Sequence, residues 1–213
     1  MRFTLSSTAL SSKLFALAKV ISNKNSLPIL ADFMFRIEGN TLSITASDSE
    51  NSMTTTIELS DSDIDDSFAI ENHSLLEAVK SFPEQPLTFE ADKNDKIVKI
   101  IYQNGQFSLP IESADVYPVA AKIADIAVSI QLSSALLSEN ISRCLCATAQ
   151  DELRPVMNGV FFDITPEYLT IVSTDGHKLV RNRIYDIKND VAASLILAKK
   201  PATILKNMLA KDD

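Results

Sequence analysis

The sequence predicts an α+β protein made of two copies of one unit, each with helices on one side of a curved antiparallel sheet. The first observation is an internal repeat, because a shift of 127 residues without a gap places residues 2–58 on residues 129–185. Twelve aligned pairs are identical, among them Leu5/Leu132, Pro28/Pro155, Phe35/Phe162, Ile44/Ile171 and Asp48/Asp175. This period exceeds the roughly 20 to 50 residues of solenoid repeats. It therefore indicates a duplicated domain.

The second observation is the order of elements at the start of the first unit. A short strand at residues 3–5 precedes capping candidates Ser6, Ser7 and Thr8, and apolar residues then recur at helical spacing up to Ile21. The polar residues 22–26 end this helix, and residues 27–37, 41–46 and 53–59 have the pattern of three strands. Gly39-Asn40 forms the tight turn between the first two strands. The acidic residues 61–66 are expected to be a solvated loop.

The third observation is that the same order recurs inside the unit. Residues 68–70 form a strand, Asn72 is a cap, Leu75, Leu76 and Val79 form one helix stripe, and the prolines of residues 83–86 stop the helix. Strands follow at 87–90, 97–102 and 107–109, with Asn104-Gly105 as a hairpin signal. Each unit therefore consists of two strand–helix–three-strand halves.

The second unit repeats this plan but is incomplete at its C-terminal end. Its helices are expected at 133–148 and 198–211, the latter with Pro201 in its first turn. Residues 113–127 connect the units, so the predicted domains are 1–122 and 123–213. The second copy stops where the first continues into the strands of 87–110.

Composition excludes several classes of protein. With 213 residues, 46% hydrophobic and 23% charged, the chain is globular. The sequence has neither an apolar run of about 18 residues nor a signal peptide, so we expect a cytoplasmic protein without membrane contact. Cys144 and Cys146 diverge by about 200° on a helix, so they cannot share a metal. We expect neither a metal nor a cofactor.

Charge is distributed unevenly along the chain. The formal net charge is −8, yet the segments 9–22, 72–80, 135–148 and 198–211, taken as the helices, carry eight basic and two acidic residues. Exposed helix faces often carry lysine, and four of the eight basic residues lie in one helix. A basic face on an acidic body nevertheless suits a protein that holds DNA at one surface.

Four segments resemble the bacterial sliding clamp, the beta subunit of the replicative DNA polymerase. They are residues 26–30 (SLPIL), 149–159 (AQDELRPVMNG), 169–179 (LTIVSTDGHKL), and 107–109 (FSL) followed by 115–118 (DVYP). The resemblance covers the whole chain and implies the DNA clamp fold. It also implies a noncatalytic homodimeric ring of three domains per protomer that encircles duplex DNA and confers processivity in replication. This chain departs from the pattern because it lacks the end of the second domain and the third domain.

The resemblance also implies three sets of site residues. Residues matching DNA contacts are Lys24, Gln150, Arg154 and Lys199. Residues matching a groove that takes short apolar peptides from the polymerase catalytic subunit, the clamp loader and other clamp-binding proteins are Met157, Thr174, Gly176, His177, Lys178 and Leu179. Residues at the implied dimer contact are Leu75, Leu76, Val79 and Phe107. Since a third domain would complete the ring, we expect no native closed dimer from this chain.

Two other functions remain as alternatives. A duplicated hydrolase would use His177 as a base oriented by Asp175, and a duplicated structural or carbohydrate-binding module would bind no polymerase peptide. No nucleophile motif or phosphate loop accompanies the pair. Asp48 recurs at the position equivalent to Asp175 without any histidine. A turn-forming Asp that accepts backbone N–H bonds explains this recurrence more simply than catalysis does.

Overall fold

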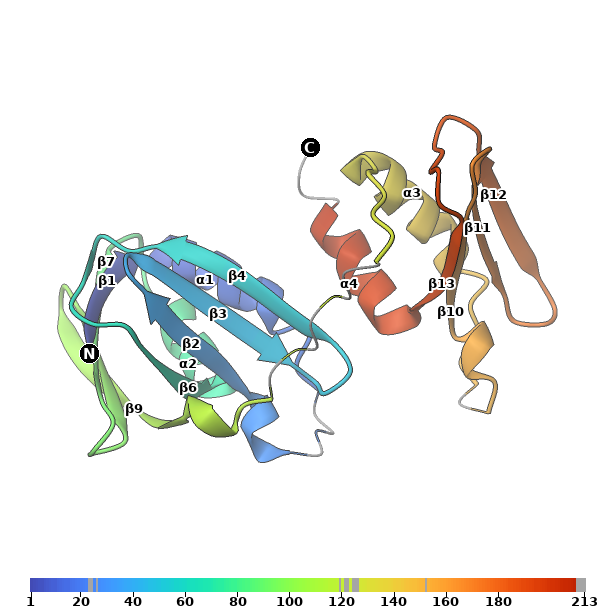
Figure 1. Ribbon diagram of the computed structural model, residues 1–213. Coiled ribbons are helices and arrows are strands. Elements are labelled where there is room, and N and C mark those ends of the chain that lie inside the picture. Colours follow the sequence, from blue (N-terminus) through green and yellow to red (C-terminus); the bar gives the residue numbers. More distant parts are fainter. Residues whose placement is uncertain are drawn as a thin grey trace. The chain divides into compact units, whose positions relative to one another are not determined.

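The computed structural model describes residues 1–22, 25, 27–118, 120, 123, 127–151 and 153–209. The chain divides into two compact units, unit 1 (Met1–Ala121) and unit 2 (Lys122–Asp213). The α+β class with antiparallel sheets is confirmed (Figure 1). Among the described residues, no helix has the length and hydropathy needed to span a bilayer.

Unit 1 contains two consecutive halves of the same order. The first half comprises β1 (Arg2–Ser6), α1 (Ser7–Leu17), the 3-10 turn η1 (Pro28–Ala31), β2 (Asp32–Glu38), β3 (Thr41–Ser47) and β4 (Ser52–Glu58). A two-residue strand β5 (Asp61–Ser62) follows. The second half comprises β6 (Asp66–Glu71), α2 (Asn72–Lys80), β7 (Pro86–Asp92), β8 (Ile97–Tyr102), β9 (Gly105–Ser113) and the turn η2 (Ala114–Val116). The predicted strand–helix–three-strand order is thus confirmed for unit 1.

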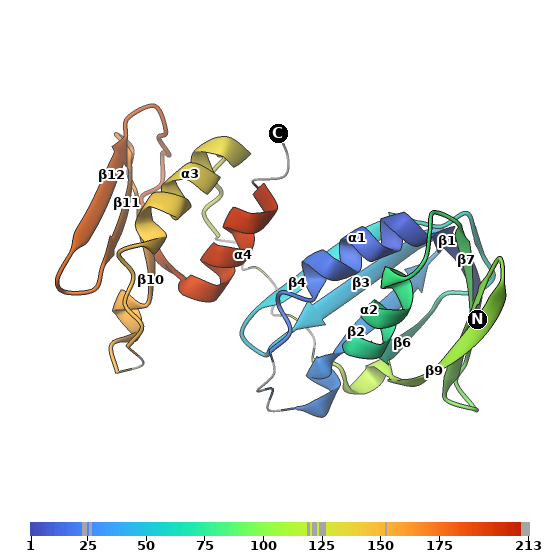
Figure 2. The same cartoon turned by 180° about the vertical axis from the view of Figure 1, so that it is seen from behind.

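The two halves of unit 1 exchange their first strands. The described strands form one sheet in the order β4-β3-β2-β6-β9-β8-β7-β1-β5. The first strand of the second half, β6, pairs with β2, and the first strand of the first half, β1, pairs with β7. Helices α1 and α2 contact each other and lie on one face of the sheet (Figure 2). Because of this exchange, neither half can complete its sheet alone.

Stacked aromatic rings form the centre of the unit 1 core. The ring centroids of Phe3 and Phe89 lie 4.9 Å apart, and those of Phe35 and Phe68 lie 5.3 Å apart. Phe35 and Phe89 come from different halves, and their centroids are separated by 6.3 Å. All four rings are fully buried. Their stacking therefore joins the two halves into one core.

Unit 2 follows unit 1 at the same 127-residue offset. Its elements are α3 (Ser134–Leu145), η3 (Pro155–Met157), β10 (Gly159–Ile164), β11 (Leu169–Thr174), β12 (Leu179–Ile184), β13 (Ala193–Ala198) and α4 (Lys199–Leu209). The offset places β13 on β6 and α4 on α2, so the structural repeat continues beyond residue 58. The sheet order is β12-β11-β10-β13. Residues 129–133, which the offset places on β1, are in no strand.

Three local predictions were wrong. Residues 27–37 are not one strand, because Pro28 begins the 3-10 turn η1 before β2 starts at Asp32. The cap of α2 is Glu71, whose carboxylate accepts bonds from the backbone N–H groups of His73 and Ser74. Asn72 instead donates its side-chain amide to the carbonyl oxygen of Ala31. The acidic stretch is not entirely loop, since β5 pairs with β1.

Candidate nucleic-acid interface and partner groove

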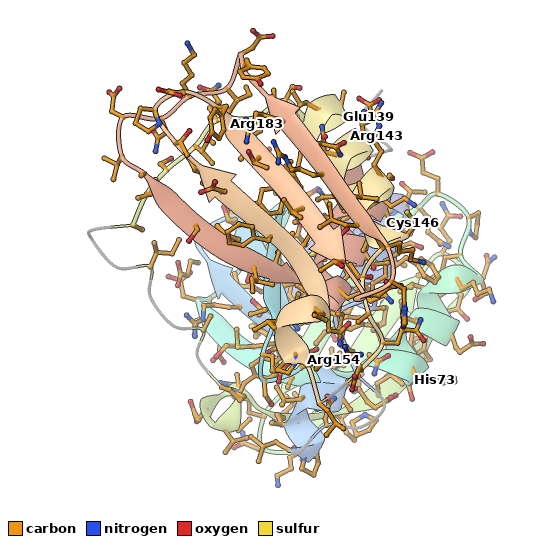
Figure 3. All side chains as sticks on the ribbon, turned by 90° about the vertical axis from the view of Figure 1, so that its right-hand side faces the viewer. His73, Glu139, Arg143, Cys146, Arg154 and Arg183 are labelled. Carbon is orange, nitrogen blue, oxygen red and sulfur yellow. The ribbon has the colours of Figure 1, made fainter. Side chains whose placement is uncertain are left out.

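Four segments of unit 2 surround a hollow of about 480 Å³. Its lining includes Leu145 and Cys146 at the end of α3, residues Thr148, Ala149, Gln150, Asp151 and Arg154 of the next loop, Asp175, His177 and Lys178 of the β11–β12 turn, and Lys199 of α4. Figure 3 shows Cys146 at the end of α3 and Arg154 beside η3. The surface therefore combines three cationic side chains with two carboxylates.

The loop after α3 owes its shape to Asp151. One carboxylate oxygen accepts the backbone N–H of Leu153 at 2.9 Å, and the other accepts Arg154 Nε at 2.7 Å. The bond from Arg154 is the main reason that the pKa of Asp151 lies below its usual range. Ala149 N–H also donates to the carbonyl oxygen of Met157 at 2.9 Å, which closes the loop. The position of Arg154 is thus fixed by both backbone and side-chain contacts.

The turn between β11 and β12 depends on Asp175 and Gly176. Asp175 Oδ1 accepts the backbone N–H groups of Lys178 and His177, each at 2.9 Å, and these bonds lower the pKa of Asp175 to about 2. Gly176 has φ +89°, a conformation that side-chain-bearing residues rarely adopt. Asp48 accepts the backbone N–H groups of Glu50 and Asn51 in the equivalent turn. The prediction that both aspartates are turn formers is confirmed.

The predicted DNA-contact residues converge in part. Gln150, Arg154 and Lys199 line the same hollow, although they come from a loop and from the first residue of a helix. Backbone N–H of Lys199 donates to the carbonyl oxygen of Asn158, which ties α4 to the loop. Within the described residues Lys199 has no ion-pair partner. Lys24 lies outside the described residues.

The predicted groove residues divide between two places. His177 and Lys178 line the hollow beside the predicted DNA contacts, whereas Leu179 begins β12 and is 63% exposed. In an extended segment the side chains of His177 and Leu179, two residues apart, would point the same way. His177 instead lies in the turn that Gly176 opens. Thr174 donates its hydroxyl to the carbonyl oxygen of Lys178 at 2.8 Å, and Met157, at the end of η3, is half-buried.

The residues of the implied dimer contact lie in unit 1. Leu75 and Val79 are fully buried beneath α2, so their side chains pack in the core and present no surface to another chain. Leu76 and Phe107 are half-buried. Phe107 belongs to an aromatic cluster that the sequence analysis missed, with ring centroids 5.8 Å from Phe82 and 6.3 Å from Tyr102. The Asn104-Gly105 hairpin could have indicated this neighbourhood, because it brings β8 beside β9.

Comparison with known proteins identifies the family. The family models for the DNA polymerase III beta subunit match residues 1–121 with the N-terminal domain and residues 131–213 with the central domain. The fold is that of solved DNA clamps: the beta subunit from Pseudomonas aeruginosa superimposes with a TM-score of 0.91 at 23% identity, covering 100% of this chain and 58% of that one. The sliding clamp from Bacillus subtilis gives 0.89 at 25% identity, covering 98% and 56%. This chain belongs to the DNA polymerase III beta subunit family.

Curated relatives with the name beta sliding clamp agree with this assignment. The protein from Pseudomonas putida is 27% identical over 180 residues, covering 84% of this chain and 48% of its own length. The protein from Bacillus subtilis is 26% identical over 217 residues, covering 98% and 57%. The chain therefore spans about half of the length of the relatives that it matches.

Proposed function

We propose that this chain is part of a DNA sliding clamp, a noncatalytic ring of two protomers that tethers a replicative DNA polymerase to duplex DNA. The observation that carries the proposal is the hollow of unit 2, where Gln150, Arg154 and Lys199 meet beside the turn of residues 174–178. Membership of the beta subunit family supports it. The expected cytoplasmic location belongs to the same proposal.

DNA contact is proposed for Lys24, Gln150, Arg154 and Lys199. Arg and Lys neutralise backbone phosphates without reading sequence, and a side-chain amide can donate to a phosphate oxygen. Such a set gives weak, salt-sensitive and sequence-independent affinity. A clamp requires such contacts, because it must slide and is retained by topology.

The partner groove is proposed for Met157, Thr174, Gly176, His177, Lys178 and Leu179. Leu179 offers exposed apolar surface, and Met157 is an unbranched side chain that adapts to varied ligands. His177, Lys178 and Thr174 supply polar groups around them. The proposed ligands are short peptides with one Gln and two or three large apolar residues, from the polymerase catalytic subunit, the clamp loader and other clamp-binding proteins.

Two further parts of the proposal concern catalysis and assembly. The Asp175 carboxylate already accepts two backbone N–H groups and lies 3.5 Å from Lys178 Nζ, an arrangement that stabilises the turn rather than activates a base. Assembly into a homodimeric ring is proposed to use Leu76 and Phe107, while Leu75 and Val79 support α2 from below.

Salt-dependent binding to a fluorescent 20-base-pair duplex tests the DNA contact. Alanine at Arg154 and at Lys199 should weaken binding, and each lost phosphate contact should reduce the log-log salt slope by about one. Arg181→Ala is the matched control, because Arg181 is an exposed arginine of β12 that does not line the hollow. An unchanged salt slope in a variant with alanine at both Arg154 and Lys199 would contradict the proposed contact. An equal loss of DNA affinity in Arg181→Ala would also contradict it.

A further inference from the structure

Arg154 connects the two parts of the hollow physically. Its Nη1 atom lies 3.5 Å from the position that a Cβ would occupy on Gly176, so the guanidinium packs against the bare backbone of the turn. Asp151 holds the guanidinium in this place through the 2.7 Å bond to Nε. The side chain thus runs from the loop of the proposed DNA contacts to the turn of the proposed groove.

The same loop carries a residue of the proposed groove. Backbone N–H of Met157 donates to the carbonyl oxygen of Arg154 at 3.0 Å, and Ala149 N–H donates to the carbonyl oxygen of Met157 at 2.9 Å. A movement of Arg154 therefore affects Met157 through the backbone and Gly176 through the guanidinium.

The ion pair that fixes Arg154 is of the kind that exchanges partners readily. Its side chains are 52% exposed for Arg154 and 33% exposed for Asp151. Exposed pairs of this kind contribute little to stability and are screened by salt. A phosphate offers the guanidinium two oxygens in a bidentate geometry. A DNA phosphate at the hollow can therefore compete with Asp151 for Arg154.

We infer that Arg154 is a positioning residue that couples DNA contact to the turn of residues 174–178. A phosphate that binds Arg154 draws the guanidinium away from Asp151 and from Gly176, so the turn loses a packing partner and becomes more mobile. DNA contact then lowers the affinity of the groove for peptide, and peptide lowers the affinity for DNA by the same factor. This inference rests on the proposed function.

The positioning role is testable without DNA, by nuclear magnetic resonance of glycine amides. The chain has four glycines, so the Gly176 signal can be assigned readily, and Gly39 and Gly105 in unit 1 are internal references. Asp151→Asn keeps an acceptor for Leu153 N–H but removes the charge that holds Arg154. The amide signals of Gly176 and His177 should shift, and their hydrogen exchange should accelerate several-fold.

A matched control is available in the same unit. Glu139 and Arg143 form another exposed ion pair, on α3 and outside the hollow (Figure 3). Glu139→Gln should leave Gly176 unchanged. A Gly176 signal that is unaffected by Asp151→Asn, or that moves no more than in Glu139→Gln, would overturn the positioning role. Thermal unfolding of each variant shows whether the fold is retained.

The coupling is tested by titration with a 12-base-pair duplex. In the unaltered chain the Gly176 amide and the Arg154 Nε–H should move with the same midpoint. In Arg154→Lys the Gly176 response should be lost, while the amide of Lys199 still moves. An equal Gly176 response in Arg154→Lys would show that another contact transmits the change. If no signal moves at all, the proposed DNA contact fails and the coupling with it, while the result for Asp151→Asn still decides the positioning role.

Discussion

At the residue scale, a recurring aspartate was more informative than the histidine beside it. Asp48 and Asp175 occupy equivalent positions, and each accepts two backbone N–H groups that follow it. The sequence allowed this prediction because only one of the two turns contains a histidine. The ion pair of Asp151 with Arg154 was missed, although a spacing of three residues on a turn is a usable signal. That Arg154 reaches Gly176 depends on the tertiary approach of two turns, which no local pattern reveals.

Gly176→Ala should destabilise the chain. Gly176 has φ +89°, and a residue with a Cβ is strained there by about 1–3 kcal/mol. Urea unfolding should show a loss of this order. Gly105→Ala is the control, because Gly105 is not among the positive-φ residues and an added Cβ would meet the tip of the Tyr102 side chain at 3.2 Å. If Gly176→Ala lowers the free energy of unfolding no more than Gly105→Ala does, a Cβ at position 176 is not strained and the prediction is wrong.

Asp32→Asn should remove one contribution to the pH dependence of the free energy of unfolding. Burial, together with the charges of Glu112 and Glu71, raises the pKa of Asp32 to about 6. The folded state therefore binds the proton more tightly than the unfolded state, whose carboxyl titrates near 3.9. The stability gained from this protonation is fully present below the unfolded-state pKa of about 3.9 and is lost as the pH rises through the folded-state pKa of about 6.

A pKa raised by about two units corresponds to a loss of about 3 kcal/mol at about 1.36 kcal/mol per unit, and solvent screening reduces this value. The free energy of unfolding of Asp32→Asn, relative to the unaltered chain, should therefore rise between pH 4 and pH 6.5 and then level off. Glu38→Gln, an exposed change at the end of the same strand, is the control. A flat difference for Asp32→Asn over this range would contradict the raised pKa.

At the element scale, the internal repeat was a more reliable guide than local propensity. Sequence similarity ended at residue 58, yet β13 and α4 lie at the offset positions of β6 and α2. Strand order could not be predicted, because the exchange of β1 and β6 between halves depends on long-range pairing. The predicted cap of α2 was wrong for a local reason. Asn is a common cap, but the Asn72 side-chain amide donates to the carbonyl oxygen of Ala31. The longer Glu71 side chain reaches the free N–H groups of the first turn instead.

Glu71→Ala should destabilise unit 1 by about 1 kcal/mol, the usual cost of removing a helix cap. Both Glu71 oxygens accept backbone N–H groups, at 2.9 Å from His73 and 2.6 Å from Ser74. Glu77→Ala is the control, since Glu77 is exposed in the same helix and does not cap it. Guanidinium unfolding of both variants measures the difference, and equal stability of the two would refute the role of Glu71 as the cap.

At the scale of the whole molecule, the duplication and the clamp-specific segment at residues 169–179 were sufficient to identify the family. The sequence did not indicate that His177 and Lys178 share a hollow with Gln150, Arg154 and Lys199. That arrangement arises because the loop after α3, the β11–β12 turn and the start of α4 meet at one end of the sheet. We therefore propose that one surface of this chain contacts both DNA and partner proteins.

Photocrosslinking from Cys146 tests this claim most directly. Of the two cysteines in the chain, Cys144 is buried and Cys146 is exposed in the hollow, so a benzophenone reagent can be attached there without mutation. Irradiation with a short duplex should crosslink the labelled chain to DNA, and the yield should fall steeply with added salt. The control carries the label at Arg181→Cys in a Cys146→Ser background and should crosslink little. An equal or higher yield from the control would contradict the account, because the DNA would then contact the protein elsewhere.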